Sequence, residues 1–177
     1  YDSYVKSLSY EGPTNLVNNV IPIIHSKNMN NLKILDFGCG TGLVGEKFKE
    51  NINKDIEYEI DGIDISLEML NKAKEKKIYN NLYKINIDHE DHSKKYDLIL
   101  TSGVFLEGHA PIILINKLVD MLNKNGYLFL TIRQSYLDKN IEIFEKEVLT
   151  NPKINKIITI EIKYLLNVKC KILFIKL

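Results

Sequence analysis

The sequence has few cysteines, no excess of charge of one sign and no long hydrophobic run. Its two cysteines, Cys39 and Cys170, are too few for a disulfide framework, and without a CxxC motif or a His/Cys cluster they do not indicate a structural zinc site. We therefore expect a reducing, cytoplasmic location. Lys and Arg total 24 and Asp and Glu total 23, so no overall field attracts the chain to nucleic acid or to an anionic membrane surface.

The short apolar runs do not indicate a membrane span. A run such as 110–115 (APIILI) falls far short of the roughly 20 residues that cross a bilayer, and the first residues lack the apolar core of a signal peptide. With 177 residues, 45% of them hydrophobic, the chain suits a single domain over 1–177. Because Tyr1 rather than methionine comes first, we expect residues before it in the natural protein.

Strand and helix patterns alternate along the chain. Periodicity predicts strands over 31–38, 56–64, 81–87, 95–103, 127–133, 154–166 and 169–177. It predicts helices over 41–52, 67–77, 111–124 and 136–150, with Ser66 as an N-cap, Pro111 in a first helical turn and Asn125-Gly126 as a stop signal. The polar segment 88–95 leaves little room for a helix between the third and fourth strands.

This order predicts an α/β fold, a Rossmann-like and mostly parallel sheet with helices on both faces. The last two strands follow each other without a helix, which predicts a hairpin that sets one strand antiparallel to the rest. Ligands of such sheets bind beyond the carboxyl ends of the strands. Candidate functional residues therefore lie where the strands end, at Asp36, Asp64, Asn86, Thr101 and Arg133.

A glycine-rich loop follows the first predicted strand, and two kinds of ligand compete for it. Gly40, Gly42 and Gly45 form a literal G-x-G-x-x-G, and Asp64 stands where the acid of an NAD site is expected. However, the strand ends at 36–38, upstream of the register that an NAD site needs. An Asp36 carboxylate beside a pyrophosphate would also be repelled.

A ligand without phosphate suits the loop better. S-adenosylmethionine carries a sulfonium and an ammonium group, which an acid at the end of the first strand attracts. Gly38, Gly40 and Gly42 then let the backbone approach the methionyl part. Asp64 accepts hydrogen bonds from both ribose hydroxyls. A glycine turn that only connects strand to helix is the structural alternative.

Three successive motifs resemble those of a known enzyme family. ILDFGCGTG (34–42), DGIDIS (61–66) with EMLNKAK (68–74), and YDLILTSG (96–103) are similar in order and spacing to the motifs of class I S-adenosylmethionine-dependent methyltransferases. More narrowly, TSGVFLEGHAP (101–111) with YLFLTIR (127–133) resembles the methyltransferase-like group of the Williams syndrome chromosomal region and its bacterial relatives. The resemblance implies a seven-stranded sheet with an antiparallel last strand and S-adenosylmethionine as cofactor.

The resemblance also implies which residues surround the cofactor. Asn86 and Ile87 are expected to flank the adenine; many relatives have Asp at the position of Asn86, but the amide oxygen can still accept a hydrogen bond. Ile65 is a candidate for the adenine face, while Met69 either packs there or belongs to the core. The candidate cofactor-binding residues are Asp36, Gly38, Cys39, Gly40, Gly42, Asp64, Ile65, Met69, Asn86, Ile87 and Thr101.

An N-terminal helical segment, 1–30, is expected to cover the cofactor site, as it does in relatives. Tyr1, Tyr4 and Tyr10 lie at its start. One of them can reach the methionyl carboxylate, and ordinary packing is the alternative for each.

His109 is the candidate catalytic residue. It follows the fourth strand, next to Glu107 and before the predicted helix at Pro111, whose N-terminal dipole disfavours an imidazolium. A neutral imidazole suits a general base, but a histidine at a helix start can also be only a cap or a surface group. We expect the acceptor pocket among Thr101, Ser102, Glu107, His109, Arg133 and Gln134.

The predicted function is methyl transfer from S-adenosylmethionine to a small-molecule acceptor, because the chain has neither an appended recognition domain nor a basic surplus. No metal site is expected, since His89 and His92 lie on a polar loop without regular ligand spacing. Two alternatives remain open. One is an NAD-dependent oxidoreductase of the same fold class, and the other is a non-catalytic, S-adenosylmethionine-binding regulatory module.

Overall fold

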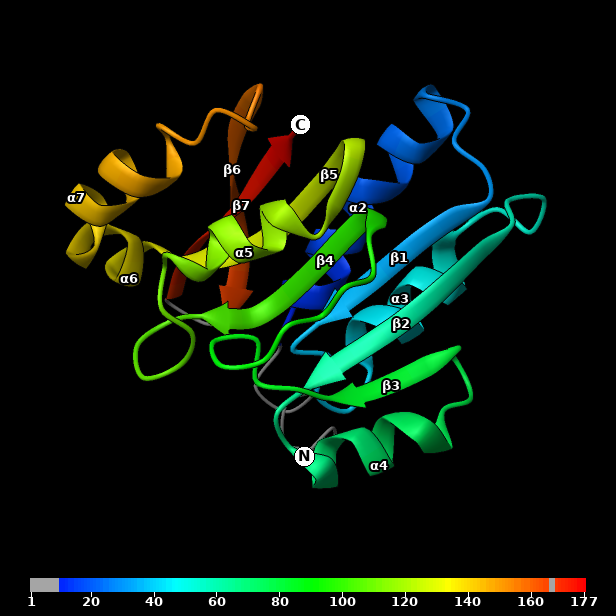
Figure 1. Ribbon diagram of the computed structural model, residues 1–177. Coiled ribbons are helices and arrows are strands. Elements are labelled where there is room, and N and C mark those ends of the chain that lie inside the picture. Colours follow the sequence, from blue (N-terminus) through cyan, green and yellow to red (C-terminus); the bar gives the residue numbers. More distant parts are fainter. Residues whose placement is uncertain (1–9, 166–167) are drawn as a thin grey trace.

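The computed structural model describes residues 10–165 and 168–177, which contain a seven-stranded sheet in the order β3-β2-β1-β4-β5-β7-β6 (Figure 1). The strands are β1 Leu32–Phe37, β2 Tyr58–Asp64, β3 Asn81–Lys84, β4 Tyr96–Phe105, β5 Leu122–Arg133, β6 Lys156–Leu165 and β7 Val168–Lys176. Strands β1 to β5 pair in parallel, whereas β7 is antiparallel to both β5 and β6. The predicted hairpin and antiparallel last strand are therefore confirmed.

Helices cover both faces of this sheet. They are α2 Gly12–Ser26, α3 Leu43–Asn51, α4 Leu67–Glu75, α5 Leu114–Asp120, α6 Gln134–Lys139, α7 Ile141–Ile143 and the π-helix η1 Phe144–Val148. Helices α2 and α3 pack on one face, α5, α6 and η1 pack on the other, and α4 lies beside β2 and β3 (Figure 1). The predicted α/β architecture is confirmed.

The central strands are apolar on both faces. In β1, Ile34 belongs to the core under α2 and α3, while the next residue, Leu35, belongs to the core under α5 and α6. In β5, Phe129 and Leu130 divide in the same way. Alternate side chains of a strand point to opposite faces, so both faces of the sheet are filled, as is typical of parallel sheets. The carboxyl ends of the strands are then the place left for a ligand.

Local signals near the ends of β2 and β3 act largely as predicted. Ser66 caps α4, because its Oγ accepts a hydrogen bond from the Met69 N–H at 3.3 Å. No helix forms between β3 and β4, where residues 85–95 are turns and irregular structure. Strand β3 ends at Lys84 instead of at the predicted residue 87, since the chain turns at Asn86, whose carbonyl accepts from the Glu90 N–H at 2.9 Å.

Two predicted helices are wrong in extent. The helix expected over 111–124 begins only at Leu114 and ends at Asp120, because Leu122 already pairs with Tyr96 of β4. The helix expected over 136–150 is broken into α6, α7 and η1, and the break falls at Asn140, whose φ and ψ of −114° and 18° are not helical.

The N-terminal segment is described from Tyr10 onward. Residues 1–9, with Tyr1 and Tyr4, lie outside the described residues. Helix α2 buries Leu16 and Val20 against the sheet, and its first turn lies beside Ser102 of β4. Among the helices described, none combines the length and apolar character needed to span a membrane.

Candidate functional site

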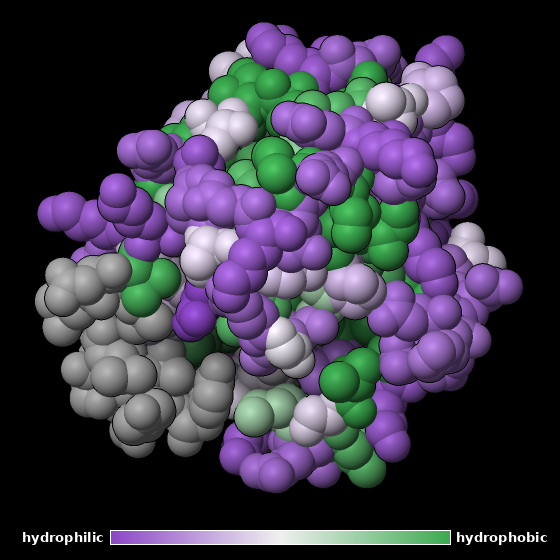
Figure 2. All heavy atoms as spheres, turned by 90° about the vertical axis from the view of Figure 1, so that its left-hand side faces the viewer, coloured by the Kyte–Doolittle hydropathy of each residue, from purple (hydrophilic) through white to green (hydrophobic). Residues whose placement is uncertain are grey.

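A cavity of about 560 Å³ opens at the carboxyl ends of β1, β2 and β4. Residues 10, 13, 37–41, 43, 44, 63–66, 69, 85–88, 102–104, 108–110 and 114 line it. Figure 2 shows the side of the molecule toward which β2 and β4 point, where hollows between hydrophilic groups expose apolar side chains. The volume is in the range of small-molecule sites, about 300–1,000 Å³.

The backbone of the glycine loop is open to this cavity. A Cβ atom built on Gly40 would meet no other atom within 4 Å, and its φ of +53° is in the left-handed region that favours glycine. A ligand can therefore approach the main chain closely at Gly40.

Three backbone N–H groups of the glycine loop form hydrogen bonds within the protein. The Cys39 N–H donates to the Ile63 carbonyl at 3.0 Å, and the Gly42 N–H donates to the Cys39 carbonyl at 2.8 Å. The Gly40 N–H donates to Oδ2 of Asp64 at 2.8 Å. A pyrophosphate site relies on such N–H groups as donors. These three N–H groups are therefore not available as donors to a pyrophosphate.

The carboxylate of Asp64 is fixed at the end of β2 by two main-chain donors. In addition to the bond from Gly40, its Oδ1 accepts the Ser66 N–H at 2.8 Å. Each carboxylate oxygen has a second lone pair. The arrangement thus presents one remaining acceptor on each oxygen to the cavity, which suits a vicinal diol.

The fixed charges among the described residues that line the cavity are negative. Asp64 and Asp88 line it, and among the described residues no lysine or arginine does. In this lining, His109 is the side chain that can gain a positive charge. A cavity with acidic groups and no fixed cation favours a positively charged ligand over an anionic one.

Most of the predicted cofactor-binding residues meet at this cavity. Its lining includes Gly38, Cys39, Gly40, Asp64, Ile65, Met69, Asn86 and Ile87. Ile65 forms part of the rim and is 68% exposed. Burial raises the pKa of the Cys39 thiol far above its ordinary value, so this cysteine is not a thiolate nucleophile. Asp36, Gly42 and Thr101 do not line the cavity, and for them the prediction of direct contact is wrong.

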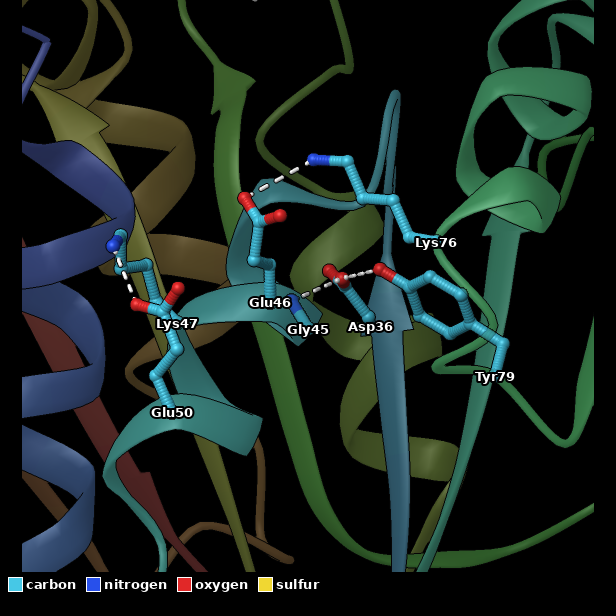
Figure 3. A network of polar contacts seen from close by, with 7 residues as sticks. All are labelled: Asp36, Gly45, Glu46, Lys47, Glu50, Lys76 and Tyr79. Atoms are coloured by element: carbon cyan, nitrogen blue, oxygen red, sulfur yellow. Dashed lines mark hydrogen bonds and ion pairs between the residues drawn. The ribbon is translucent and has the colours of Figure 1, made fainter.

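Asp36 points away from the cavity for a reason of strand geometry. Alternate residues of β1 share a face, so Asp36 shares the face of Ile34, which α3 covers, and its side chain is fully buried there. Its Oδ2 accepts the Tyr79 hydroxyl at 2.6 Å and the Gly45 N–H at 3.2 Å (Figure 3). Burial raises the pKa of Asp36 to about 7, although these two hydrogen bonds act in the opposite direction.

His109 lines the cavity, but the electrostatic argument for it is wrong. Helix α5 begins at Leu114 rather than near Pro111, and it has only 7 residues. The His109 side chain is exposed, and the backbone N–H of His109 donates to the Leu106 carbonyl at 3.1 Å. Exposure of the imidazole to both water and the cavity leaves a role in proton transfer chemically possible.

The predicted acceptor pocket is only partly assembled. Ser102 and His109 line the cavity, whereas Thr101, Glu107, Arg133 and Gln134 do not. Glu107 instead accepts the Ser135 hydroxyl at 2.7 Å, and it lies 3.9 Å from the Arg133 guanidinium. These side chains form a polar cluster beside the cavity.

One acidic group at the cavity escaped the sequence prediction. Asp88 lines it, and its N–H donates to the Asn86 Oδ1 at 3.1 Å. An acid two residues beyond Asn86 is the signal that could have indicated Asp88. Tyr10, one of the three tyrosines expected near the cofactor, lines the cavity, and its hydroxyl lies 2.9 Å from the Ser102 hydroxyl and 3.2 Å from the Tyr164 hydroxyl. No local pattern predicts contacts between segments so far apart in the sequence.

The strand bulge in β4 forms the other wall. The pairing of β4 with β5 shifts between Thr101 and Phe105, and Gly103 has a φ of +79°. The Gly103 N–H leaves the ladder and donates to the Thr131 hydroxyl at 3.1 Å. Bulges often redirect side chains next to active sites, and this one brings residues 102–104 into the cavity wall.

The loop histidines have no metal-binding partners in the described part of the chain. The Nε2 of His92 lies 2.8 Å from the Tyr96 hydroxyl, beside which the ring stacks. Among residues 10–165 and 168–177, no group of three or more His, Cys, Asp or Glu side chains could hold a metal ion.

Comparison with known proteins identifies the family. Residues 35–128, which include the glycine loop, Asp64 and Asn86, match the family model of a methyltransferase domain. The chain belongs to this methyltransferase family. The predicted enzyme class is confirmed, and the oxidoreductase alternative is rejected.

Two curated relatives of this methyltransferase are similar over part of their length. Malonyl-(acyl-carrier protein) O-methyltransferase of Acetivibrio thermocellus is 26% identical over 130 residues, which cover 72% of the chain and 43% of that protein. Malonyl-(acyl-carrier protein) O-methyltransferase 2 of Ilyobacter polytropus is 39% identical over 75 residues, 41% of the chain and 28% of that protein. The chain thus spans less than half the length of either relative.

Solved structures support the fold of the methyltransferase over nearly its whole length. An S-adenosylmethionine-dependent methyltransferase from Clostridium acetobutylicum has a TM-score of 0.67 and 16% identity, and the match covers 93% of this chain and 91% of that one. The class I methyltransferase fold predicted from the motifs is confirmed.

Proposed function

We propose that this enzyme, an S-adenosylmethionine-dependent methyltransferase, binds its cofactor in the 560 Å³ cavity and transfers the methyl group to a small-molecule acceptor at the same strand ends. The observation that carries the assignment of the cavity is the geometry of Asp64. Both of its oxygens are fixed by backbone N–H groups, at 2.8 Å each, and both keep a lone pair for the two hydroxyls of a ribose.

The donor set of the cavity fits the rest of the cofactor. S-adenosylmethionine has no phosphate, which agrees with a loop whose N–H groups are already bonded. Its sulfonium and ammonium groups agree with a lining that carries acids and no fixed cation in the described residues. Ile65, Met69 and Ile87 supply apolar surface for the adenine.

Asn86 has one role defined by the fold and a second that we assign to it. Its Oδ1 already accepts the Asp88 N–H at 3.1 Å, so the turn after β3 fixes the orientation of the amide. An amide oxygen has two lone pairs. We assign the second to the adenine amino group, with Asp88 as an additional acceptor beside it.

Catalysis by these residues is mainly a matter of position. The methyl group passes in a single displacement from a leaving thioether, which needs no proton. Alignment of two bound reactants can supply about 7–11 kcal/mol of the barrier. The chain contributes by fixing the ribose through Asp64, by letting the loop at Gly40 approach the ligand, and by excluding water with the apolar side chains of the cavity.

We assign to His109 the removal of the acceptor's proton. This step is needed only when the acceptor is protonated at neutral pH, as an alcohol is. His109 lines the cavity near Ser102 and Gly103 of the β4 bulge. Its exposure gives the accepted proton a path to water.

The acceptor class rests on size and charge. The chain has nearly equal numbers of basic and acidic residues, 24 and 23, and its cavity is of small-molecule size. The relatives named for malonyl-(acyl-carrier protein) O-methylation make the free carboxylate of a malonyl thioester a reasonable first acceptor to test. The narrower resemblance to the Williams syndrome group, the cytoplasmic location and the single domain over 1–177 stay predictions.

An untargeted acceptor screen tests this function. The purified enzyme is mixed with the small-molecule fraction or the protein fraction of a cell extract and with S-adenosylmethionine that carries a labelled methyl group, and labelled products are sought by mass spectrometry. We expect labelled small molecules together with S-adenosylhomocysteine. Cofactor binding without any labelled product, in extract or in the protein fraction, would favour the regulatory-module alternative.

A further inference from the structure

Tyr79 lies behind the glycine loop, outside the cavity, and joins three elements at one oxygen atom. Its hydroxyl donates to Oδ2 of Asp36 in β1 at 2.6 Å. The N–H of Gly45 in α3 donates to the same oxygen at 3.2 Å. Figure 3 shows the phenol and Gly45 converging on the carboxylate. The segment after α4 is thus tied to the strand and the helix on either side of the loop.

The ring of Tyr79 occupies space that glycines leave free. A Cβ atom on Gly45 would lie 2.6 Å from the Tyr79 hydroxyl oxygen, and one on Gly42 would lie 3.1 Å from the ring. Gly62 of β2 leaves similar room, because a Cβ atom on Gly62 would lie 3.1 Å from the ring of Tyr79. Gly45, the third glycine of the G-x-G-x-x-G pattern, therefore makes room for Tyr79. This packing explains the glycine without a dinucleotide ligand.

Neighbouring residues fix the position of Tyr79. The Asn80 N–H donates to the Ile60 carbonyl at 2.8 Å, and the Asn80 Oδ1 accepts the Ile60 N–H at 2.9 Å. On the other side, the Lys76 ammonium lies 3.2 Å from the Glu46 carboxylate of α3 (Figure 3). Tyr79 is therefore held between an attachment to β2 and an ion pair to α3.

The surroundings of Asp36 contain no positive partner among the groups that interact with it. Tyr79 faces it from the segment after α4, Cys39 from the loop and Asp64 from β2, while α3 presents the Gly45 N–H and β4 presents Leu100. Burial, with a smaller contribution from the negative charge of Asp64, raises the pKa of Asp36 to about 7 against the lowering effect of the hydrogen bonds from Tyr79 and Gly45. Within residues 10–165 and 168–177, no group forms a hydrogen bond with Oδ1 of Asp36.

We propose that Tyr79 is a positioning residue for the cofactor: its ring supports the glycine loop, and its hydroxyl keeps the Asp36 carboxylate beneath that loop. There the negative charge favours the sulfonium cofactor over the thioether product, which lacks that positive charge. The inference rests on the proposed cofactor site. The arrangement lets the enzyme bind its reactant in preference to its product, because the positive charge of the sulfonium, which Asp36 attracts, disappears in the reaction.

Calorimetric titration over a range of pH tests this proposal. Dissociation constants of S-adenosylmethionine and S-adenosylhomocysteine are measured between about pH 6 and pH 8.5, which brackets the pKa of Asp36. The proteins are the wild type, Tyr79→Phe, Asp36→Asn and the matched control Tyr58→Phe, which removes a hydroxyl at the far end of β2. Asp36→Asn keeps an acceptor oxygen but cannot ionise, so its profile records the titration of the ligands and of other groups such as His109.

We expect the preference of the wild type for the sulfonium ligand to rise with pH relative to that of Asp36→Asn. The rise is about tenfold for each unit by which the bound cofactor lowers the pKa of Asp36. In Tyr79→Phe the lost hydrogen bond moves this rise to higher pH, so that near neutrality its preference approaches that of Asp36→Asn. Tyr58→Phe should follow the wild type.

Each other outcome has a definite meaning. A Tyr79→Phe profile that superimposes on the wild type, even with a lowered melting temperature, overturns the positioning role. If Tyr79→Phe does not fold, the two remaining proteins decide, and parallel profiles of the wild type and Asp36→Asn overturn the proposal. Failure of the wild type to bind either ligand at any pH would instead reject the proposed cofactor site.

Discussion

The carboxylate of Asp64 accepts the N–H of Gly40 at 2.8 Å, which joins the end of β2 to the middle of the glycine loop. The same carboxylate accepts the Ser66 N–H at the start of α4. One side chain thus sets the spacing between the loop and the adjacent strand, and it also presents acceptors to the cavity. Removal of this side chain should therefore affect binding more than folding.

Asp64→Ala should weaken S-adenosylmethionine binding by about 1.5–3 kcal/mol, the range for hydrogen bonds to a charged group. Titration calorimetry measures the loss. Asp55→Ala is the matched control, because Asp55 is an exposed aspartate in the turn before β2. An unchanged affinity in a folded Asp64→Ala protein would remove Asp64 from the site.

Gly45→Ala should destabilise the enzyme by about 1–3 kcal/mol, the usual cost of overpacking. The added methyl group would start 2.6 Å from the Tyr79 hydroxyl oxygen. In urea unfolding, Tyr79→Phe should suppress part of this loss, because it removes the nearest atom. Lys49→Ala, on the exposed face of the same helix, should change stability little. Additive effects of the two substitutions would show that Gly45 and Tyr79 are not in contact.

Asp36→Asn should change how stability depends on pH. Burial raises the pKa of Asp36 from 3.8 to about 7, so between these values the folded protein binds more protons than the unfolded chain. The stabilisation is complete below about pH 4 and is lost as the pH rises through about 7, by a total on the order of 4 kcal/mol. As the pH rises across this window, the unfolding free energy of the wild type should therefore fall relative to that of Asp36→Asn. A constant difference from pH 4 to pH 7.5 or so would contradict the raised pKa.

His109→Asn should leave cofactor affinity nearly unchanged and lower turnover by about 10²–10⁴-fold, the usual contribution of a general base. The rate should recover in part at high pH, where an acceptor such as an alcohol ionises without help. A pH–rate profile with an identified acceptor measures both effects. Wild-type activity of His109→Asn at every pH would leave His109 a surface residue.

The succession of strands along the chain and the position of Asp64 at a strand end could be predicted because they depend on local signals. Apolar strands alternate with helical patterns, and Ser66 caps the helix that follows Asp64. The place of Asp36 could not be predicted in the same way. Both faces of β1 are apolar, so the sequence does not say which face of the strand looks toward the ligand.

Other errors come from contacts between distant segments. Leu122 continues the apolar spacing of the helix before it, yet it is buried by pairing with Tyr96 of β4. Tyr79 lies 43 residues from Asp36, its partner in the structure. Periodicity reports that such side chains are buried, but not which element buries them.

Thermal unfolding with added ligands tests the central claim most directly. S-adenosylmethionine and S-adenosylhomocysteine should each raise the melting temperature, and further as the ligand concentration rises, since both bind the folded state. NAD and NADP should not, because the loop N–H groups are bonded internally and the described lining of the cavity has no cation for a pyrophosphate. Protection by a nicotinamide cofactor, with none from the two adenosyl ligands, would contradict the account.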